Sequence, residues 1–242
     1  MEEYNQKLNW EITALLWQQA LNLTGQSEDP LTLRGEAANE TDLFRSGTEN
    51  KNVMLVSLVY SFKMQLAYYF GATEMMEDLF LKTRNSTDHF MSLVYHPRQV
   101  FFDALVAFYL CQHTGHANAR KRRQWLKEAN KARHQIQAWA KAGNVNLTHA
   151  MVLLDAESDA CRGRREGAKR KYELAISLSS RSGHQQDCAL AHERAALNYL
   201  ELRDAYWASH HMSSAHEKYL QWGARSKASQ IMEAYGYLMK NE

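Results

Sequence analysis

The chain has 242 residues, of which 45% are hydrophobic, so it is long enough to bury a sizeable core without disulfides or structural metals. Its 29 basic and 27 acidic residues leave a formal net charge of +2, which excludes any need for a polyanionic partner. There are only 2 prolines and 11 glycines, and 30 alanines stand against 22 Val, Ile and Thr residues, a balance that favours helix almost throughout.

The cysteines and the hydropathy pattern bear on the compartment. Cys111, Cys161 and Cys188 are widely spaced and form no CxxC pair, which disfavours a disulfide framework or a zinc knuckle and favours a reducing compartment. The first ten residues are polar and acidic, and no run approaches 18 apolar residues, so secretion and membrane spanning are both disfavoured. We expect a cytoplasmic protein.

The first part of the chain combines one periodic segment with one irregular segment. Apolar residues at helical spacing predict a helix over about 4–23, which Gly25 ends. From 26 to 52 the periodicity stops and proline and glycine interrupt a polar stretch. We expect an irregular insert there, with at most a short helical turn near 42–45.

Helical patterning returns at Val53 and continues in segments separated by glycine joints. Gly71 reads as the turn of a helical hairpin, and Pro97 suits the first turn of the helix that follows it. The predicted helices cover 53–70, 73–83, 100–111, 119–142, 147–161, 166–180, 185–202, 205–221 and 225–239. No strand pair or linker interrupts them, so we expect one all-α domain over residues 1–242 with about ten helices.

A small-large-small triplet recurs along the chain, and it indicates a helical repeat. The triplet occurs at Ala168, Tyr172 and Ala175 and again 40 residues later at Ala208, Met212 and Ala215, with a weaker copy at Met76, Phe80 and Thr83. Residues three and four apart share a helix face, so the small side chains let a neighbouring helix approach while the large one fills the gap. The triplets predict a right-handed superhelical stack of antiparallel helix pairs, a tetratricopeptide-like α-solenoid.

Six short stretches carry a resemblance to a known family. They are WQQALNLTG (17–25), LRGEA (33–37), YYFG (68–71), FFDALVA (101–107), ALAHERAALNY (189–199) and YLQWGARSK (219–227). With them the chain resembles the tetratricopeptide-type region of multidomain signalling proteins that join a serine/threonine-kinase-like domain, an AAA/STAND ATPase, a GAF domain and a sensor histidine kinase. The resemblance implies a sensing or docking surface that follows the ATPase module. The chain has no Walker loop and no kinase signature, so the resemblance implies no enzyme activity here.

The patterns of a zinc site are incomplete. His192 and His216 are each followed by a glutamate, as in zinc proteases, but Ala196 and Leu220 stand where the second histidine belongs. A partial metal site with no convincing fourth ligand nearby is formed by Cys111, His113 and His116. We therefore expect no metal ion.

Two further groups of residues resemble functional patterns, a pH-sensitive histidine cluster and a phosphate-binding loop, but neither pattern is complete. The densest histidine group, His210, His211 and His216, could make a pH-sensitive surface, but its spacing places the rings on different helix faces. The segment 163–169 has glycines and a lysine without the spacing of a phosphate-binding loop. We expect no cofactor and no catalytic residue.

Two basic runs leave an alternative function open. One lies within 120–133 and the other within 162–171, and together they contain Arg120, Lys121, Arg122, Arg123, Lys127, Lys131, Arg133, Arg162, Arg164, Arg165, Lys169, Arg170 and Lys171. Such runs suit nucleic acid or phosphate, yet only Trp125 is interleaved as a stacking platform. A solvated helix face or a dock for an acidic protein is the simpler interpretation.

The leading hypothesis is a non-enzymatic module that binds a protein or peptide on the concave face of its repeats. We expect Gln186, His192 and Asn198, on the predicted helix 185–202, to present polar groups there. Most of the aromatic residues at helical spacing are expected in the core, and they are Trp10, Trp17, Tyr199, Tyr206, Tyr219 and Trp222. We expect Trp222 and Gly223 to be packing positions. A second hypothesis is a regulatory segment that holds an ATPase or kinase module in cis or in trans. The oligomeric state stays open.

Overall fold

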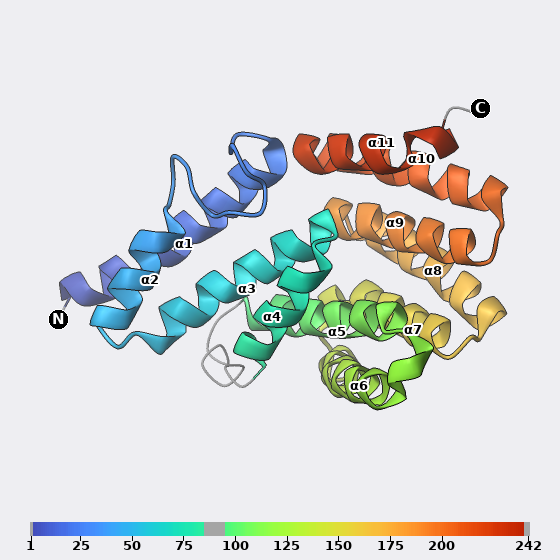
Figure 1. Cartoon of the computed structure of the whole chain (residues 1–242), viewed down its shortest axis with the longest axis horizontal. Coiled ribbons are helices and arrows are strands. Elements are labelled where there is room, and N and C mark those ends of the chain that lie inside the picture. Colours follow the sequence, from blue (N-terminus) through green and yellow to red (C-terminus); the bar gives the residue numbers. More distant parts are fainter. Residues whose placement is uncertain (1, 85–94, 240–242) are drawn as a thin grey trace. The chain divides into compact units, whose positions relative to one another are not determined.

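The computed structural model describes residues 2–84 and 95–239, with side chains from residue 9 onward except that of His116, and it is helical almost throughout (Figure 1). The α-helices are α1 (Glu2–Thr24), α2 (Glu40–Glu49), α3 (Val53–Phe70), α4 (Thr73–Thr83), α5 (His96–His113), α6 (Ala119–Lys141), α7 (Thr148–Cys161), α8 (Arg165–Arg181), α9 (Gln185–Glu201), α10 (Ala205–Trp222) and α11 (Arg225–Met239). Short 3-10 turns, η2 (His116–Asn118) and η3 (Val145–Leu147), precede α6 and α7. Over the described ranges, Arg34 and Asn39 alone pair as extended residues, so the predicted all-α class is confirmed.

The residues group into two compact units. Unit 1 comprises residues 1–99 with 224–227, and unit 2 comprises 100–223 with 228–242. The division falls inside α5, where the backbone is continuous helix. No linker therefore marks it in the sequence, from which one domain over 1–242 was predicted.

The helix boundaries agree closely with those that periodicity and glycine joints predict. α3 and α4 begin and end at the predicted residues, and Pro97 lies in the first turn of α5 as expected. The exception is α2, because the sequence predicted at most one helical turn near 42–45 and the structure has a ten-residue helix. α2 is short and buries only Leu43 and Gly47, so few residues mark it in the sequence. Asn39 caps it by accepting a hydrogen bond from the Thr41 N–H.

α3 is the core helix of unit 1. It is the one described helix that is long and apolar enough to cross a membrane by length and composition alone, yet 67% of it is buried inside the protein. Leu55, Leu58 and Phe62 have no exposed surface, and α1, α2 and α4 all pack on this helix. A helix that is apolar on most of its circumference is expected to be surrounded in this way.

The first part of the predicted irregular insert, residues 26–39, is an ordered loop held by two buried amides of α1. Asn22 Nδ2 donates to three carbonyl oxygens of the loop at 2.7 to 3.2 Å, those of Asp29, Pro30 and Thr32. Gln18 Oε1 accepts hydrogen bonds from two backbone N–H groups at 3.1 and 3.2 Å, those of Ala37 and Ala38. Gln18 Nε2 also donates to Asn22 Oδ1 at 2.9 Å, which fixes both amides. The loop therefore satisfies its backbone groups without a strand or helix.

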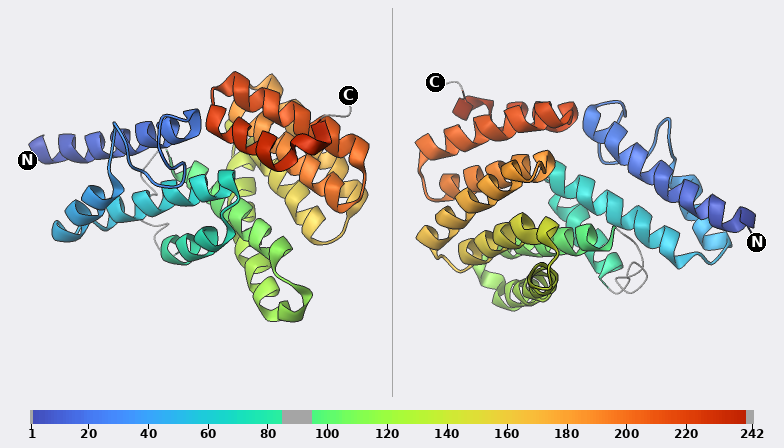
Figure 2. Two further views of the ribbon diagram at one scale, coloured as in Figure 1. Left: turned by 45° about the horizontal axis from the view of Figure 1, so that its top comes forward. Right: turned by 180° about the vertical axis from the view of Figure 1, so that it is seen from behind.

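Unit 2 contains two kinds of helix. α7 and α9 are buried on nearly every side, whereas α8 and α10 bury one stripe each. The buried stripes include the predicted triplets, since Ala168, Tyr172, Ala175, Ala208, Met212 and Ala215 are each at most 1% exposed. Consecutive helices from α7 to α10 pack against each other and lie side by side (Figures 1 and 2).

A left-handed glycine ends α8 and begins the turn to α9. Gly183 has φ of +75°, a conformation that costs an L-residue strain, and the next residue donates its N–H to the Ser179 carbonyl at 3.0 Å. The joint between α8 and α9 consists of residues 182–184, and it turns the chain so that α9 runs antiparallel to α8. The short joint thus explains why α9 packs directly against the helix that precedes it.

Candidate functional site

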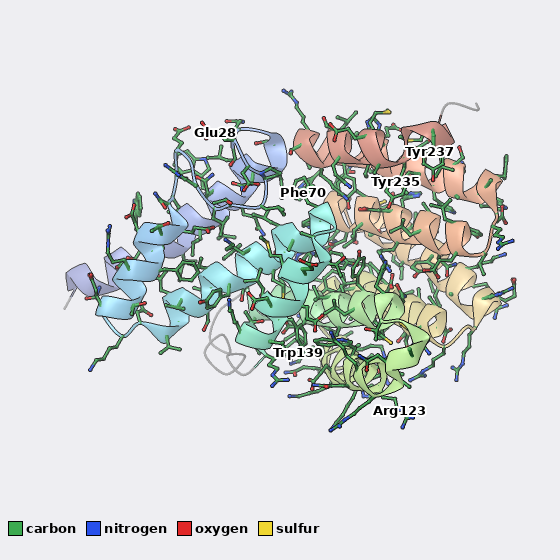
Figure 3. All side chains as sticks on the ribbon, in the orientation of Figure 1. Glu28, Phe70, Arg123, Trp139, Tyr235 and Tyr237 are labelled. Atoms are coloured by element: carbon green, nitrogen blue, oxygen red, sulfur yellow. The ribbon has the colours of Figure 1, made fainter. Side chains whose placement is uncertain are left out.

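Unit 2 contains a cavity of about 260 Å³ between its helices. Residues of α5, α7, α8, α9 and α11 line it: Tyr109, Gln112, His113, Ala160, Tyr172, Arg194, Leu197, Asn198, Leu200, Glu201 and Tyr235. The α11 residue, Tyr235, is labelled in Figure 3. Helix α9 supplies the largest share of the wall, because its residues 194, 197, 198 and 201 lie on one helical face.

A buried ion pair lies at the wall of the cavity. Arg194 Nε donates to Glu157 Oε1 at 2.8 Å, and an Arg194 terminal nitrogen donates to Glu157 Oε2 at 2.9 Å. The two side chains are 6% and 1% exposed. A guanidinium and a carboxylate that meet through two parallel hydrogen bonds have the geometry that best offsets the cost of burying both charges.

Two neutral side chains complete the bonding of this pair. Gln112 accepts a hydrogen bond from Arg194 at 2.8 Å and donates one to Glu157 at 3.1 Å. The Tyr172 hydroxyl donates to Glu157 Oε1 at 2.9 Å. Burial, and next the Glu157 carboxylate, raise the pKa of Tyr172 well above its ordinary value, so the phenol stays a donor. The network joins α5, α7, α8 and α9.

Asn198 brings an unused donor to the same cavity. Its side chain lines the cavity and is 8% exposed, and its Nδ2 has no hydrogen-bond partner. A buried amide N–H without an acceptor costs free energy that a bound group can recover by accepting its hydrogen bond. The Nδ2 atom itself is covered, so an acceptor of a bound molecule gains this hydrogen bond once the Asn198 side chain turns toward the cavity.

Aromatic rings line the same cavity as Asn198. The rings of Tyr109 and His113 stack with their centroids 3.9 Å apart, and the Arg194 guanidinium lies over Tyr109 at 5.8 Å. Burial raises the pKa of Tyr235, with Glu193 as the next cause, so its phenol is neutral at physiological pH. The cavity thus offers neutral hydrogen-bonding groups beside apolar and aromatic surface, and its only exposed carboxylate is that of Glu201.

The structure places the three predicted binding residues apart from one another. Of Gln186, His192 and Asn198, only Asn198 lines the cavity. Gln186 is half-buried in the first turn of α9. The His192 ring faces α10, where its Nδ1 lies 3.2 Å from His211 Nδ1. Burial, followed by the charges of His211, His210 and Lys218, lowers the pKa of His192 to about 3.

The predicted core aromatics divide into two groups. Tyr199 and Tyr219 are buried, as expected, and the Tyr219 hydroxyl donates to Glu193 at 2.8 Å. Trp222 and Gly223 end α10, with Trp222 only half-buried and Gly223 in the left-handed conformation. The prediction is wrong for three exposed side chains, because their helix faces point away from neighbouring helices: Trp10 at 68%, Trp17 at 53% and Tyr206 at 75%.

In the part of the chain that the structure describes, the residues of the incomplete metal patterns do not come together as a metal site. No three His, Cys, Asp or Glu residues there come together as ligands. His211 points to Glu173 at 3.0 Å and stacks on Tyr199, so it serves packing between α8, α9 and α10. The side chain of His116 lies outside the described ones, and the prediction that includes it is not tested.

The two basic runs lie beside each other, and acidic neighbours neutralise part of their charge. Arg162 donates to Asn130 of α6 at 3.4 Å, which connects the runs. Asp155 pairs with Arg133, and Asp159 pairs with Lys171 and Arg164. Trp125 is 3% exposed, so it offers no stacking platform. The basic side chains that remain exposed on α6 include Arg123 (Figure 3).

Sequence reasoning missed Arg194, Glu157 and Gln112. Arg194 stands between Glu193 and Ala195 on an alanine-rich helix, and Glu157 follows Leu153 and Leu154 at helical spacing. A charged residue on an apolar face signals a buried pair, because an isolated charge is too costly there. Both residues show this signal, but the signal does not identify Arg194 and Glu157 as partners of each other.

Comparisons with family models, with curated proteins and with solved structures found no match for this chain. The resemblance noted from six sequence stretches therefore stays a prediction. The interpretation of the cavity rests on its own geometry.

Proposed function

We propose that unit 2 is a tetratricopeptide-like helical repeat that binds an extended segment of a partner protein in the cavity beside Asn198. The observation that carries the proposal is the unpartnered, buried Asn198 Nδ2 in the cavity wall. First helices of successive pairs, α5, α7, α9 and α11, supply most of that wall, as expected of the inner face of such a repeat.

The size and chemistry of the cavity favour a peptide anchor over a small molecule. Cavities that enclose whole small-molecule ligands usually have about 300 to 1,000 Å³, and this one has about 260 Å³. A single peptide side chain with its backbone amide suits it, because the amide accepts from Asn198 while Leu197, Leu200 and the tyrosine rings contact the side chain. The proposal includes no catalytic residue and no cofactor.

The sequence resemblance suggests the source of the partner segment. We propose a segment of an ATPase or kinase module, presented in cis or in trans, which would make the chain a cytoplasmic docking or regulatory module. The alternative through the basic runs is less favoured, since carboxylates pair with four of the basic residues and Trp125 is buried. A nucleic-acid ligand would reveal itself by affinity that falls steeply with salt.

The test is a selection of peptides that bind the isolated chain, followed by calorimetry on two variants. Asn198→Leu removes the donor and keeps the branched shape of the side chain. Gln186→Ala changes α9 outside the cavity. We expect selected peptides to lose at least about tenfold in affinity with the first variant, the value of one hydrogen bond of about 1.4 kcal/mol, and nothing with the second. If the selected peptides bind wild type and Asn198→Leu with equal affinity, the proposal is contradicted.

A further inference from the structure

Two of the three cysteines lie together in unit 2, on facing helices. Cys161 ends α7, and its Sγ lies 3.6 Å from the carbonyl oxygen of Phe108 on α5. Cys111 is three residues further along α5, on the same face as Phe108, which places its side chain next to the Cys161 thiol. Both side chains are buried, at 1% and 6% exposure, and both thiols are free.

A cation lies beside this pair. Arg122 of α6 donates to the backbone carbonyl of Cys161 at 3.0 Å, so its positive charge lies close to both cysteines. The hydrogen bond from Cys161, followed by the Arg122 charge and hydrogen bond against the opposing effect of burial, lowers the pKa of Cys111 to about 7. The same contact and burial raise the pKa of Cys161. One sulfur is therefore a thiolate at neutral pH in a good part of the molecules, and the other is a protonated thiol held against it.

We propose that Cys111 and Cys161 are a peroxide-responsive pair that converts reversibly to an intramolecular disulfide joining α5 to α7. The Cys111 thiolate attacks one oxygen of hydrogen peroxide, the O–O bond breaks, and the departing hydroxide takes a proton to give water and a sulfenic acid on Cys111. The Cys161 sulfur then attacks the sulfenic sulfur, the S–O bond breaks, and the hydroxide released takes the Cys161 proton. Two thiols are oxidised by two electrons in total, and one peroxide is reduced to two waters.

The position of the pair gives the disulfide a structural effect. Cys111 precedes Gln112 of the buried ion network, and Cys161 follows Ala160 of the cavity wall. A disulfide brings its sulfurs to about 2.05 Å, closer than any hydrogen bond, so α5 and α7 must approach or twist at this point. The inference does not depend on what the cavity binds.

The test uses the full chain, reduced and then treated with hydrogen peroxide before alkylation of the remaining thiols. We expect peptide mapping to find a Cys111–Cys161 disulfide that dithiothreitol reverses, while Cys188, buried on α9 against Ile176 of α8, is alkylated. Cys188→Ser should form the same disulfide. Cys161→Ser should stop at a sulfenic acid on Cys111 that dimedone traps, and circular dichroism would show that this variant is folded.

The pH dependence of the reaction distinguishes an activated Cys111 thiol from an ordinary thiol that merely lies near Cys161. The oxidation rate of wild type should rise about tenfold per pH unit below pH 7 and level off above it, whereas an ordinary thiol continues to rise to about pH 8.5. A disulfide that forms only in denaturant, equal pairing with Cys188, or a folded Cys161→Ser chain with no dimedone adduct would each overturn the proposal.

Discussion

Arg194 of α9 and Glu157 of α7 meet through hydrogen bonds of 2.8 and 2.9 Å while both side chains are almost completely buried. The pair joins two helices that a third helix, α8, separates in the chain. Removal of one partner leaves the other as an uncompensated buried charge, which typically costs about 3 to 5 kcal/mol.

Glu157→Gln should lower the free energy of unfolding by about 3 to 5 kcal/mol, because it leaves the nearly buried Arg194 guanidinium without its counter-charge. Urea unfolding followed by circular dichroism measures the change. The double variant Glu157→Leu, Arg194→Met should regain most of the loss. The matched control is Glu166→Gln, which removes an exposed pairing with Lys169 and should leave the urea midpoint unchanged. A double variant as unstable as the single one would contradict this account.

Asn198→Leu should leave the protein as stable as wild type or make it more stable. The substitution removes a buried N–H that has no acceptor and replaces it with apolar volume. The gain expected is up to about 1 kcal/mol in the free energy of unfolding, measured in urea. A loss of stability would mean that Asn198 Nδ2 has a partner in solution, and it would weaken the proposed binding role at the same time.

Asn22→Ala should free the ordered loop 26–39 from α1. Three carbonyl oxygens lose their donor, so we expect a loss of about 1 to 3 kcal/mol and faster amide exchange in this loop. Hydrogen exchange read by mass spectrometry measures it segment by segment. Thr13→Ala on the exposed face of α1 is the control and should leave exchange in the loop as it is. Unchanged protection in Asn22→Ala would show that the buried amide does not order the loop.

Gly183→Ala should destabilise the chain by about 1 to 2 kcal/mol, because an L-residue is strained at φ of +75°. Gly115→Ala is the matched substitution, since Gly115 has φ of −55° and no atom within 4 Å of an added Cβ. It should be neutral or stabilise by up to about 1 kcal/mol through the unfolded state. Thermal unfolding of the two variants distinguishes them, and equal effects would contradict the assigned turn.

The unfolding free energy should fall as the pH drops from about 6.5 toward 3. The pKa of His192 is about 3 in the folded protein, against about 6.5 for an unfolded histidine, so the unfolded state binds more protons in this window. The contribution of His192 is complete above pH 6.5 and is lost on acidification, with a slope of up to about 1.4 kcal/mol per pH unit. The lowered pKa of His211, with burial as its main cause, acts in the same direction.

His192→Gln should therefore flatten the pH dependence of stability between pH 4 and 6.5. Urea unfolding at several pH values measures the slope, and His134→Gln, at an exposed position on α6, serves as the comparison. Parallel pH curves for wild type and His192→Gln would show that the His192 ring is not held neutral by its surroundings.

The sequence predicted the helices well because helix signals are local. Periodicity and glycine joints placed α3 and α4 to the residue, and the small-large-small triplets marked buried stripes of α8 and α10. α2 was missed because it has only ten residues and its buried side is marked by Leu43 and Gly47 alone. Asn198, one of the three predicted binding residues, lines the cavity. Arg194 and Glu157 are 37 residues apart, and no local pattern pairs them. Their partnership depends on how α7 and α9 pack.

The buried pair also limits how the chain can be lengthened. Stacks of helical repeats are usually open to insertion or deletion of a unit, since each unit contacts only its neighbours. Here an extra helix pair placed between α8 and α9 would carry Arg194 away from Glu157, Gln112 and Tyr172 and leave charges of both signs buried without a counterpart. The network therefore constrains how many helices lie between α7 and α9 and in which order they follow, as well as how they pack.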